Sequence, residues 1–234
     1  MGVGLGLRHP HPGASDYHVT YNSTAPSPDP MPPPITSVLF DMDGVLCDYD
    51  RSLRVAHLAA ASGCTPEQIR HAIWGSGLEA QADAGALSEP EYLSAVADLL
   101  GCSIPLEHWL LARRAAMSPN PDVLALAAAV STRHRVAILT NNCHMVTDNM
   151  SFICPAIAQV FGTAIYSSAS FKATKPAAQA YLLCVDAFGF KAAEVLFIDD
   201  VDANVTGAIE AGLPAYKYIG ADALSNELRR LKLL

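Results

Sequence analysis

The stretch VLFDMDGVLCD, from Val38 to Asp48, places two aspartates directly after an apolar run and directly before a glycine. A buried strand disfavours charge, so two carboxylates at its end indicate a polar site there. Asp41 and Asp43 are two residues apart, which puts both side chains on the same side of an extended chain. Gly44 permits a sharp turn after the second aspartate. The segment therefore predicts a buried strand that delivers two acids to one site.

Later segments repeat this apolar character and alternate with helical patterns. The expected strands are 134–142, 163–168, 194–200 and 214–220, and the expected helices are 121–132, 143–160, 176–188 and 203–211. Such alternation is typical of a parallel sheet with helices on both faces. The sequence therefore predicts an α/β fold with a doubly wound, Rossmann-like sheet that binds ligands at the carboxyl ends of its strands.

The region 49–118 interrupts the alternation and contains no convincing strand. Thr65-Pro66-Glu67-Gln68 and Ser88-Glu89-Pro90-Glu91 are typical helix starts, because each combines a hydroxyl N-cap, an early proline and a residue that closes a capping box. Helices are expected over 51–62, 65–74, 88–100 and 105–117. We therefore predict an α/β core, 35–48 and 119–234, with a helical cap, 49–118, inserted after the first strand.

The composition limits the remaining possibilities. Residues 1–34 hold half of the 16 prolines without a hydrophobic period, which predicts a disordered Pro-rich tail, and Met31 could be the true start. The formal charge of −8 argues against nucleic-acid binding, and no apolar run approaches a membrane span. No signal peptide is recognisable, and the six cysteines lack a CxxC pattern. We expect a cytoplasmic protein without a membrane partner, as a monomer or homodimer.

Phosphate-binding groups follow the other expected strands. Thr140 and Asn141 end the strand at 134–142, where a hydroxyl and backbone amides could hold a phosphoryl oxygen. Lys175, at the start of a later helix, would supply a fixed positive charge. Phosphoryl transfer needs such groups around the transferred oxygens, together with an in-line nucleophile.

The aspartates complete this constellation. Asp41, Asp43, Asp199 and Asp200 could form the hard oxygen site that Mg²⁺ prefers. Asp41 would attack phosphorus and form an aspartyl-phosphate. Asp43 would protonate the leaving oxygen and later activate the hydrolytic water.

Taken together, these motifs resemble those of the haloacid dehalogenase-like (HAD) hydrolase superfamily, in its phosphatase branch with a helical cap after the first core strand. Four segments match the family motifs in order: DMDGV (41–45), ILTNN (138–142), the lysine within KATKPAAQAY (172–181), and FIDDVDANVTGAIEAG (197–212). The resemblance covers about residue 35 to the C-terminus. It implies a Mg²⁺-dependent phosphatase that acts on a small phosphorylated metabolite, including sugar phosphates.

The resemblance also implies a role for each matched residue. Thr140, Asn141 and Lys175 would hold the phosphate. Asp43 would bind the metal through its backbone carbonyl and Asp200 directly, with Asp199 acting through water. The same resemblance gives Asn204 and Gly207 the task of shaping the fourth loop.

Other interpretations stay open from the sequence alone. A 2-haloacid dehalogenase shares the fold but does not need the second acid, so Asp43 argues against it. A phosphosugar mutase uses the same motifs, and a non-catalytic binding protein would be expected to have lost one of them. Four residues of the helical region could face a substrate, although packing or a solvated face is the simpler interpretation: Trp74, Glu79, Gln81 and Asp83.

Overall fold

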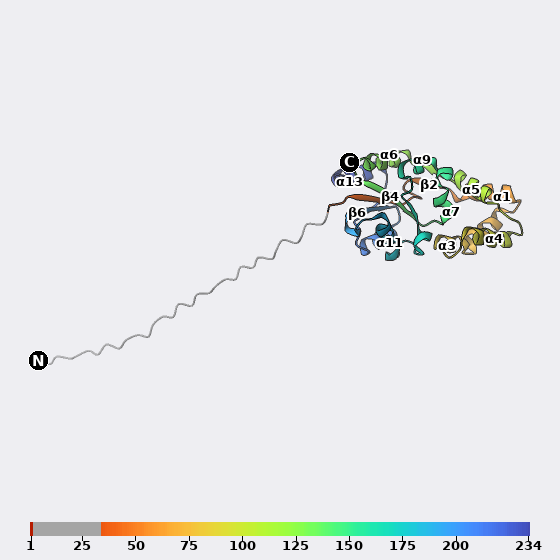
Figure 1. The fold of residues 1–234 in the computed structure, drawn as a ribbon, viewed down its shortest axis with the longest axis horizontal. Coiled ribbons are helices and arrows are strands. Elements are labelled where there is room, and N and C mark those ends of the chain that lie inside the picture. Colours follow the sequence, from red (N-terminus) through yellow and green to blue (C-terminus); the bar gives the residue numbers. More distant parts are fainter. Residues whose placement is uncertain (2–33) are drawn as a thin grey trace. The chain divides into compact units, whose positions relative to one another are not determined.

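The computed structural model describes Met1 and residues 34–234; the predicted disordered tail falls, apart from those two ends, outside the described residues. Five parallel strands form a sheet in the order β5-β4-β1-β6-β7 (Figure 1). They are β1 Ser37–Phe40, β4 Arg135–Thr140, β5 Ile165–Ser167, β6 Val195–Asp199 and β7 Ala215–Lys217. The predicted α/β fold with a parallel sheet is confirmed.

Strand β1 lies at the centre of the sheet, between β4 and β6. Phe40 is in register with Ile138 on one side and with Ile198 on the other. Val38 and Phe40 point to one face and Leu39 to the other, and all are fully buried. Because the three strands run in parallel and in register, their carboxyl ends meet at one edge of the sheet. The residues that follow these strands are therefore neighbours.

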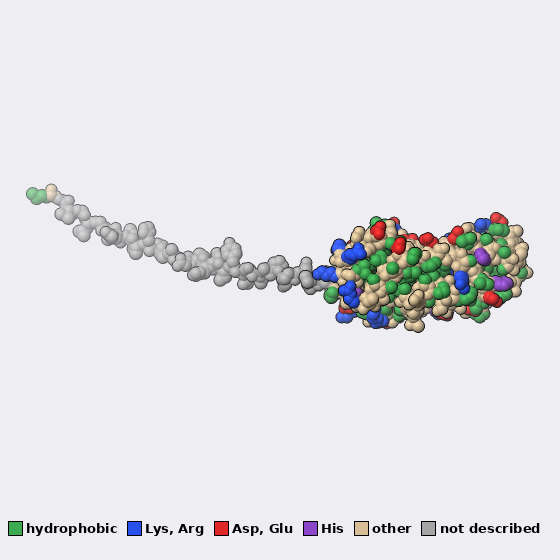
Figure 2. All heavy atoms as spheres, turned by 90° about the horizontal axis from the view of Figure 1, so that it is seen from above, with side chains coloured by type: hydrophobic (Ala, Val, Ile, Leu, Met, Phe, Trp, Pro, Cys, Tyr) green, Lys and Arg blue, Asp and Glu red, His purple; other side chains and the backbone are tan. Residues whose placement is uncertain are grey.

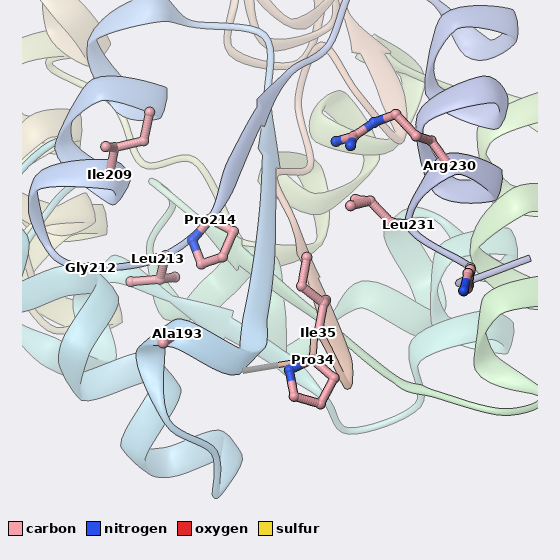
Figure 3. A pocket seen from close by; sticks show the side chains of 10 residues that line it. Pro34, Ile35, Ala193, Ile209, Gly212, Leu213, Pro214, Arg230 and Leu231 are labelled. Carbon is pink, nitrogen blue, oxygen red and sulfur yellow. The ribbon is translucent and has the colours of Figure 1, made fainter. Parts of the chain in front are cut away.

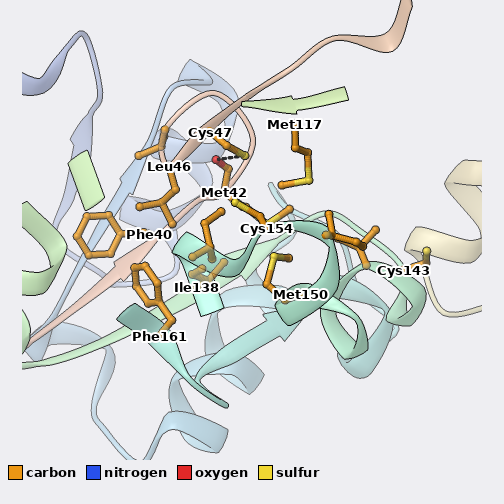
Figure 4. Packing of buried hydrophobic residues seen from close by; sticks show 14 of the residues in the cluster. Phe40, Met42, Leu46, Cys47, Met117, Ile138, Cys143, Met150, Cys154 and Phe161 are labelled. Carbon is orange, nitrogen blue, oxygen red and sulfur yellow. Dashed lines mark hydrogen bonds between the residues drawn. The ribbon is translucent and has the colours of Figure 1, made fainter. Parts of the chain in front are cut away.

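Helices cover both faces of the sheet (Figure 1). Helices α11 (Ala178–Phe188) and α12 (Asp202–Glu210) bury apolar residues against the face that carries Leu39. Helices α6 (Pro121–Ser131), α9 (Pro155–Phe161) and α13 (Ala221–Arg230) cover the opposite face. On that face Phe40 meets Phe161 edge to face, with ring centroids 5.7 Å apart (Figure 4).

The expected helix 143–160 is wrong as one continuous element. It consists of α7 (His144–Asp148), α8 (Met150–Ile153) and α9. Pro155 has no N–H to continue a helix, so it begins α9 instead. Two further short helices that the sequence did not predict are α10 (Ser168–Phe171) and the 3₁₀ turn η2 (Ala192–Glu194).

The region after β1 forms a group of helices, called here the helical unit (residues 51–116). Its elements are α1 Arg51–Ser62, α2 Pro66–Arg70, the π-helical turn η1 His71–Gly75, α3 Leu78–Asp83, α4 Glu89–Leu100 and α5 Leu106–Ala116. Both predicted capping boxes are present; the Thr65 N–H, for example, donates to Gln68 Oε1 over 2.8 Å. The sequence missed α3, a helix of six residues that begins after Gly77.

Two short strands border the helical unit. Strand β2 (Cys47–Tyr49) pairs antiparallel with β3 (Met117–Pro119). The expectation that 49–118 holds no strand is therefore wrong at both of its ends. This pairing places the start and the end of the helical unit next to each other.

The surface of the described residues adds two observations. On the face in Figure 2, lysine and arginine side chains gather at one end, whereas acidic side chains are scattered over the rest. A cavity of about 810 Å³ is lined by residues that include Ile35, Leu213, Pro214 and Leu231 (Figure 3). Ile35 precedes β1, so this cavity lies at the amino edge of the sheet, away from the predicted site. No described helix is long and apolar enough to cross a membrane.

Candidate active site

A buried lysine joins two carboxylates at the carboxyl edge of the sheet. Asp41 directly follows β1, and its N–H donates to the Ile198 carbonyl over 2.8 Å. Lys175 Nζ lies 2.7 Å from Asp41 Oδ1 and 2.7 Å from Asp199 Oδ2. Burial raises the pKa of Asp41 to about 7 although the Lys175 ammonium opposes that change. Burial would lower the pKa of Lys175, but the two carboxylates outweigh it and raise that pKa, so the ammonium stays charged.

Asp199 is held by several donors. Its Oδ1 accepts from the Val201 N–H over 2.8 Å, and Asn204 Nδ2 donates to Oδ1 over 3.1 Å and to Oδ2 over 3.0 Å. These bonds are the contacts through which Asn204 would shape the loop. Position 207 requires glycine for a steric reason, because a Cβ there would lie 2.3 Å from the Pro176 carbonyl oxygen.

Asp200 differs from Asp199 in lacking such partners. Its Oδ1 is buried without a hydrogen-bond partner, and burial, followed by the Asp199 charge, raises its pKa. A Cβ at Gly44, where φ is +92°, would lie 2.4 Å from Asp200 Oδ2, so this approach requires glycine. One carboxylate oxygen from each of Asp41, Asp199 and Asp200 lies within 4.8 Å of the others. Lys175 pairs with two of these three acids, and the unpartnered oxygen of Asp200 completes a group of carboxylates that fits a hard cation.

Asp43 turns toward the helical unit. The Arg113 guanidinium donates from one nitrogen to Asp43 Oδ2 over 2.7 Å and to Oδ1 over 3.0 Å. Asn142 Nδ2 adds a bond of 3.0 Å to Oδ2. Burial would raise the pKa of Asp43, but Arg113 and Asn142 outweigh it and lower that pKa. The Arg113 guanidinium lies over the Tyr49 ring, with its Cζ 3.8 Å from the ring centroid. The second acid is therefore held ionised.

The residues after β4 connect these groups. Thr140 Oγ1 accepts a hydrogen bond of 2.7 Å from Asn142. The Asn141 side chain exchanges two hydrogen bonds of 2.9 Å with the backbone of Lys175. The residues that the sequence predicts for catalysis, phosphate binding and metal binding therefore lie together at one edge of the sheet. Asp43 differs from the other acids there, because it is bound to Arg113 and not to the carboxylate cluster.

A cavity of about 300 Å³ lies between this edge and the helical unit. The core contributes Asp43, Asn141 and Asn142, and the lining from the helical unit includes Trp74, Glu79, Asp83 and Arg113. Ser168 Oγ donates to the Asp83 backbone carbonyl over 2.5 Å, which joins α3 to the core. The cavity therefore opens onto the predicted acid of the site.

The far wall of this cavity contains a buried ion pair. Both terminal nitrogens of Arg54 donate to the Glu79 carboxylate, and Tyr92 Oη donates to its Oε2 over 2.5 Å. Arg54 is fully buried and lies over the Trp109 ring at 4.6 Å. Asp83 has no such side-chain donor, and burial together with the Glu79 charge raises its pKa to about 8.

The sequence did not predict the roles of these arginines. The buried face of α5 carries Trp109, Arg113 and Ala116 at helical spacing. A charged residue at one of these core positions was the signal in the sequence that could have singled out Arg113. Trp74, Glu79 and Asp83, for which packing was the simpler interpretation, line the cavity, whereas Gln81 is exposed. Nothing local in the sequence connects Arg113 to Asp43, which are 70 residues apart.

The chain is similar to known proteins in both sequence and fold. A family model described as haloacid dehalogenase-like hydrolase matches residues 35–212. Phosphatase MT3486 of Mycobacterium tuberculosis (strain CDC 1551 / Oshkosh) is 32% identical over 189 residues, covering 78% of this chain and 86% of that protein.

Two solved structures share the fold. A predicted HAD-like family hydrolase from Porphyromonas gingivalis has a TM-score of 0.69 at 22% identity, covering 83% of this chain and 98% of that one. The second is the HAD family enzyme BT-2542 from Bacteroides thetaiotaomicron, in complex with magnesium and inorganic phosphate. It has a TM-score of 0.66 at 20% identity, and the match covers 79% of this chain and 94% of that one.

Proposed function

Because this chain belongs to the haloacid dehalogenase-like hydrolase family, we propose that it is a Mg²⁺-dependent phosphatase of small phosphate monoesters. The observation that carries the proposal is the carboxylate cluster around Asp41, with Lys175 at 2.7 Å and a second acid two residues on. The relative named a phosphatase, and the fold neighbour that holds magnesium and phosphate, support the same reaction class.

The acids at the sheet edge fit a magnesium ion. Asp41 and Asp200 would hold it through their side chains, Asp43 through its backbone carbonyl, and Asp199 through water. The orphaned Oδ1 of Asp200 favours it over Asp199 as a direct ligand, because Asp199 already accepts from Lys175, Asn204 and Val201. When bound, such an ion neutralises charge on the phosphoryl oxygens.

The side chains then divide the reaction between them. Asp41 attacks phosphorus and forms an aspartyl-phosphate, while Lys175 and the Thr140–Asn141 segment hold the phosphoryl oxygens. In the first step the protonated form of Asp43 donates its proton to the leaving oxygen and becomes a carboxylate, and in the second that carboxylate removes a proton from the hydrolytic water. The contact with Arg113 lowers the pKa of Asp43 and so favours the carboxylate that the second step requires, which leaves the protonated form needed for the first step as the minor one.

The helical unit would act as a cap that selects the substrate. A cavity of about 300 Å³ is at the small end of ligand sites, which favours a small metabolite, such as a sugar phosphate, over a folded protein phosphoester. Asp43 argues against a dehalogenase, because a departing halide needs no proton.

Phosphate release from p-nitrophenyl phosphate and a panel of sugar and nucleotide monophosphates, with Mg²⁺ and with EDTA, tests this proposal. We expect release in Mg²⁺ that EDTA abolishes, over many turnovers without added bisphosphate, which a mutase would require. Well-folded protein that releases phosphate from no member would overturn it, and dehalogenase assays would then follow.

A further inference from the structure

Two thiols in the helical unit lie against each other at the ends of two helices. Cys64 Sγ is 3.5 Å from Cys102 Sγ, although the residues are 38 apart in the sequence. Cys64 follows the Gly63 that ends α1, and Cys102 follows the Gly101 that ends α4; both glycines have positive φ, +74° and +70°.

The surroundings of the two thiols are nearly symmetrical. Cys64 Sγ lies 3.9 Å from the Leu100 carbonyl oxygen at the end of α4. Cys102 Sγ lies 3.9 Å from the Ser62 carbonyl oxygen at the end of α1. Each thiol therefore reaches across to the other helix end, and the sulfurs meet between them.

This pair differs from the other cysteines in exposure. Cys64 and Cys102 are half-buried, whereas Cys47, Cys143, Cys154 and Cys184 are buried. A disulfide needs a sulfur separation of about 2.0 Å, so the two half-buried thiols, whose sulfurs lie 3.5 Å apart, require only a small approach to close.

We propose that Cys64 and Cys102 form a thiol–disulfide site that a low-molecular-weight disulfide, such as oxidised glutathione, converts to an internal disulfide. One thiolate attacks a glutathione sulfur, giving a mixed disulfide and one glutathione thiolate. The second cysteine then attacks the protein sulfur of the mixed disulfide and displaces the other glutathione. Both cysteine protons pass to the departing thiolates, so two cysteines are oxidised and one glutathione disulfide is reduced to two thiols.

The bond would close a loop that carries much of the cavity wall. Trp74, Glu79 and Asp83 lie between the two cysteines, while α1 and α4 supply Arg54 and Tyr92, the partners of Glu79. Closing a loop of this length restricts the unfolded chain, which stabilises the folded helical unit. The site is independent of the proposed phosphatase chemistry, because neither cysteine lines the cavity.

Incubation of the native full chain with oxidised glutathione tests the proposal. We expect mass spectrometry after trypsin digestion to find Cys64 linked to Cys102, with two fewer free thiols and a higher thermal midpoint that reductant reverses. Cys64→Ser and Cys102→Ser should each lose the effect, whereas Cys184→Ala, which keeps the pair, should retain the linkage. Persistent glutathione adducts, no loss of thiols, or linkage to another cysteine would each overturn the proposal.

Discussion

The carboxyl edge of the sheet and the wall of the helical unit both bury charge, but they balance it differently. At the sheet edge Asp41 and Asp199 share one ammonium, that of Lys175, and the carboxylate of Asp200 beside them has no ion pair of its own within the described part of the chain. In the helical unit the Glu79 carboxylate is matched by the Arg54 guanidinium and a tyrosine hydroxyl.

This difference separates a reactive site from a structural one. A buried charge that has its partners built in stabilises one arrangement, and removing one partner is costly. A group of acids without enough cations takes up protons, as the raised pKa values of Asp41 and Asp200 indicate, unless something else supplies positive charge. The surplus of carboxylate at the sheet edge is therefore the feature that supports the proposed metal site.

The largest expected effect comes from the centre of the sheet edge. Asp41→Asn preserves the shape of the side chain but removes the nucleophile, so turnover of p-nitrophenyl phosphate in Mg²⁺ should fall at least about 10⁴-fold. Steady-state rates measure this, and circular dichroism checks that the fold is intact. A rate within tenfold of wild type would contradict a covalent role for Asp41.

Magnesium should stabilise the folded protein through the same edge. At a concentration about 100 times its dissociation constant, it should raise the thermal midpoint by roughly 5–10 °C. Asp200→Asn should reduce that rise strongly. The matched control is Asp202→Asn, which changes an acid of the same helix start whose side chain is 89% exposed, and it should keep the full rise. Equal responses of the two variants would remove Asp200 from the metal site.

The helical unit should respond in stability rather than chemistry. Glu79→Gln leaves the Arg54 charge buried without its partner, which should cost about 3 kcal/mol in the free energy of unfolding. Urea titration measures this, and the folded variant should still hydrolyse p-nitrophenyl phosphate. Glu67→Gln breaks an exposed ion pair with Arg70 and should change little. Similar curves for the two variants would show that the buried pair is not structural.

The smallest expected effect is the pH dependence that Asp83 imposes. Folding raises the pKa of this carboxyl from 3.8 to about 8, so the folded protein binds the extra proton between these values and loses stability as the pH rises through them. Asp83→Asn removes that loss. The variant should therefore gain on wild type by about 1–2 kcal/mol between pH 5 and pH 6, by urea titration at each pH. A constant difference would show that Asp83 ionises freely.

The predictions from sequence succeeded where local signals agree with the tertiary fold. Val38 to Phe40 is apolar because both faces of its strand are covered, and the Thr65 and Ser88 helix starts satisfy their own backbone groups. Helix α3 was missed because it has only six residues, and Glu79 within it is held by contacts from α1 and α4.

The residues of the site divide in the same way, into those that local sequence patterns predict and those whose contacts depend on packing. Asp41, Thr140 and Asp199 could be grouped in advance because parallel strands deliver their ends to one edge. The bond between Arg113 and Asp43 could not, because it depends on how α5 packs against the core. Likewise, no local pattern predicts that β2 and β3 pair with each other, which places Cys47 opposite Pro119.

The most direct test of the covalent role of Asp41 is to trap its intermediate. In Asp43→Asn, p-nitrophenyl phosphate supplies a leaving group that needs no proton, so the first step should proceed while hydrolysis is slow. We expect acid-quenched protein to carry one phosphoryl group on the peptide that contains Asp41. Phosphate on another residue, or no adduct in a variant that still releases nitrophenol in a burst, would contradict the proposed mechanism.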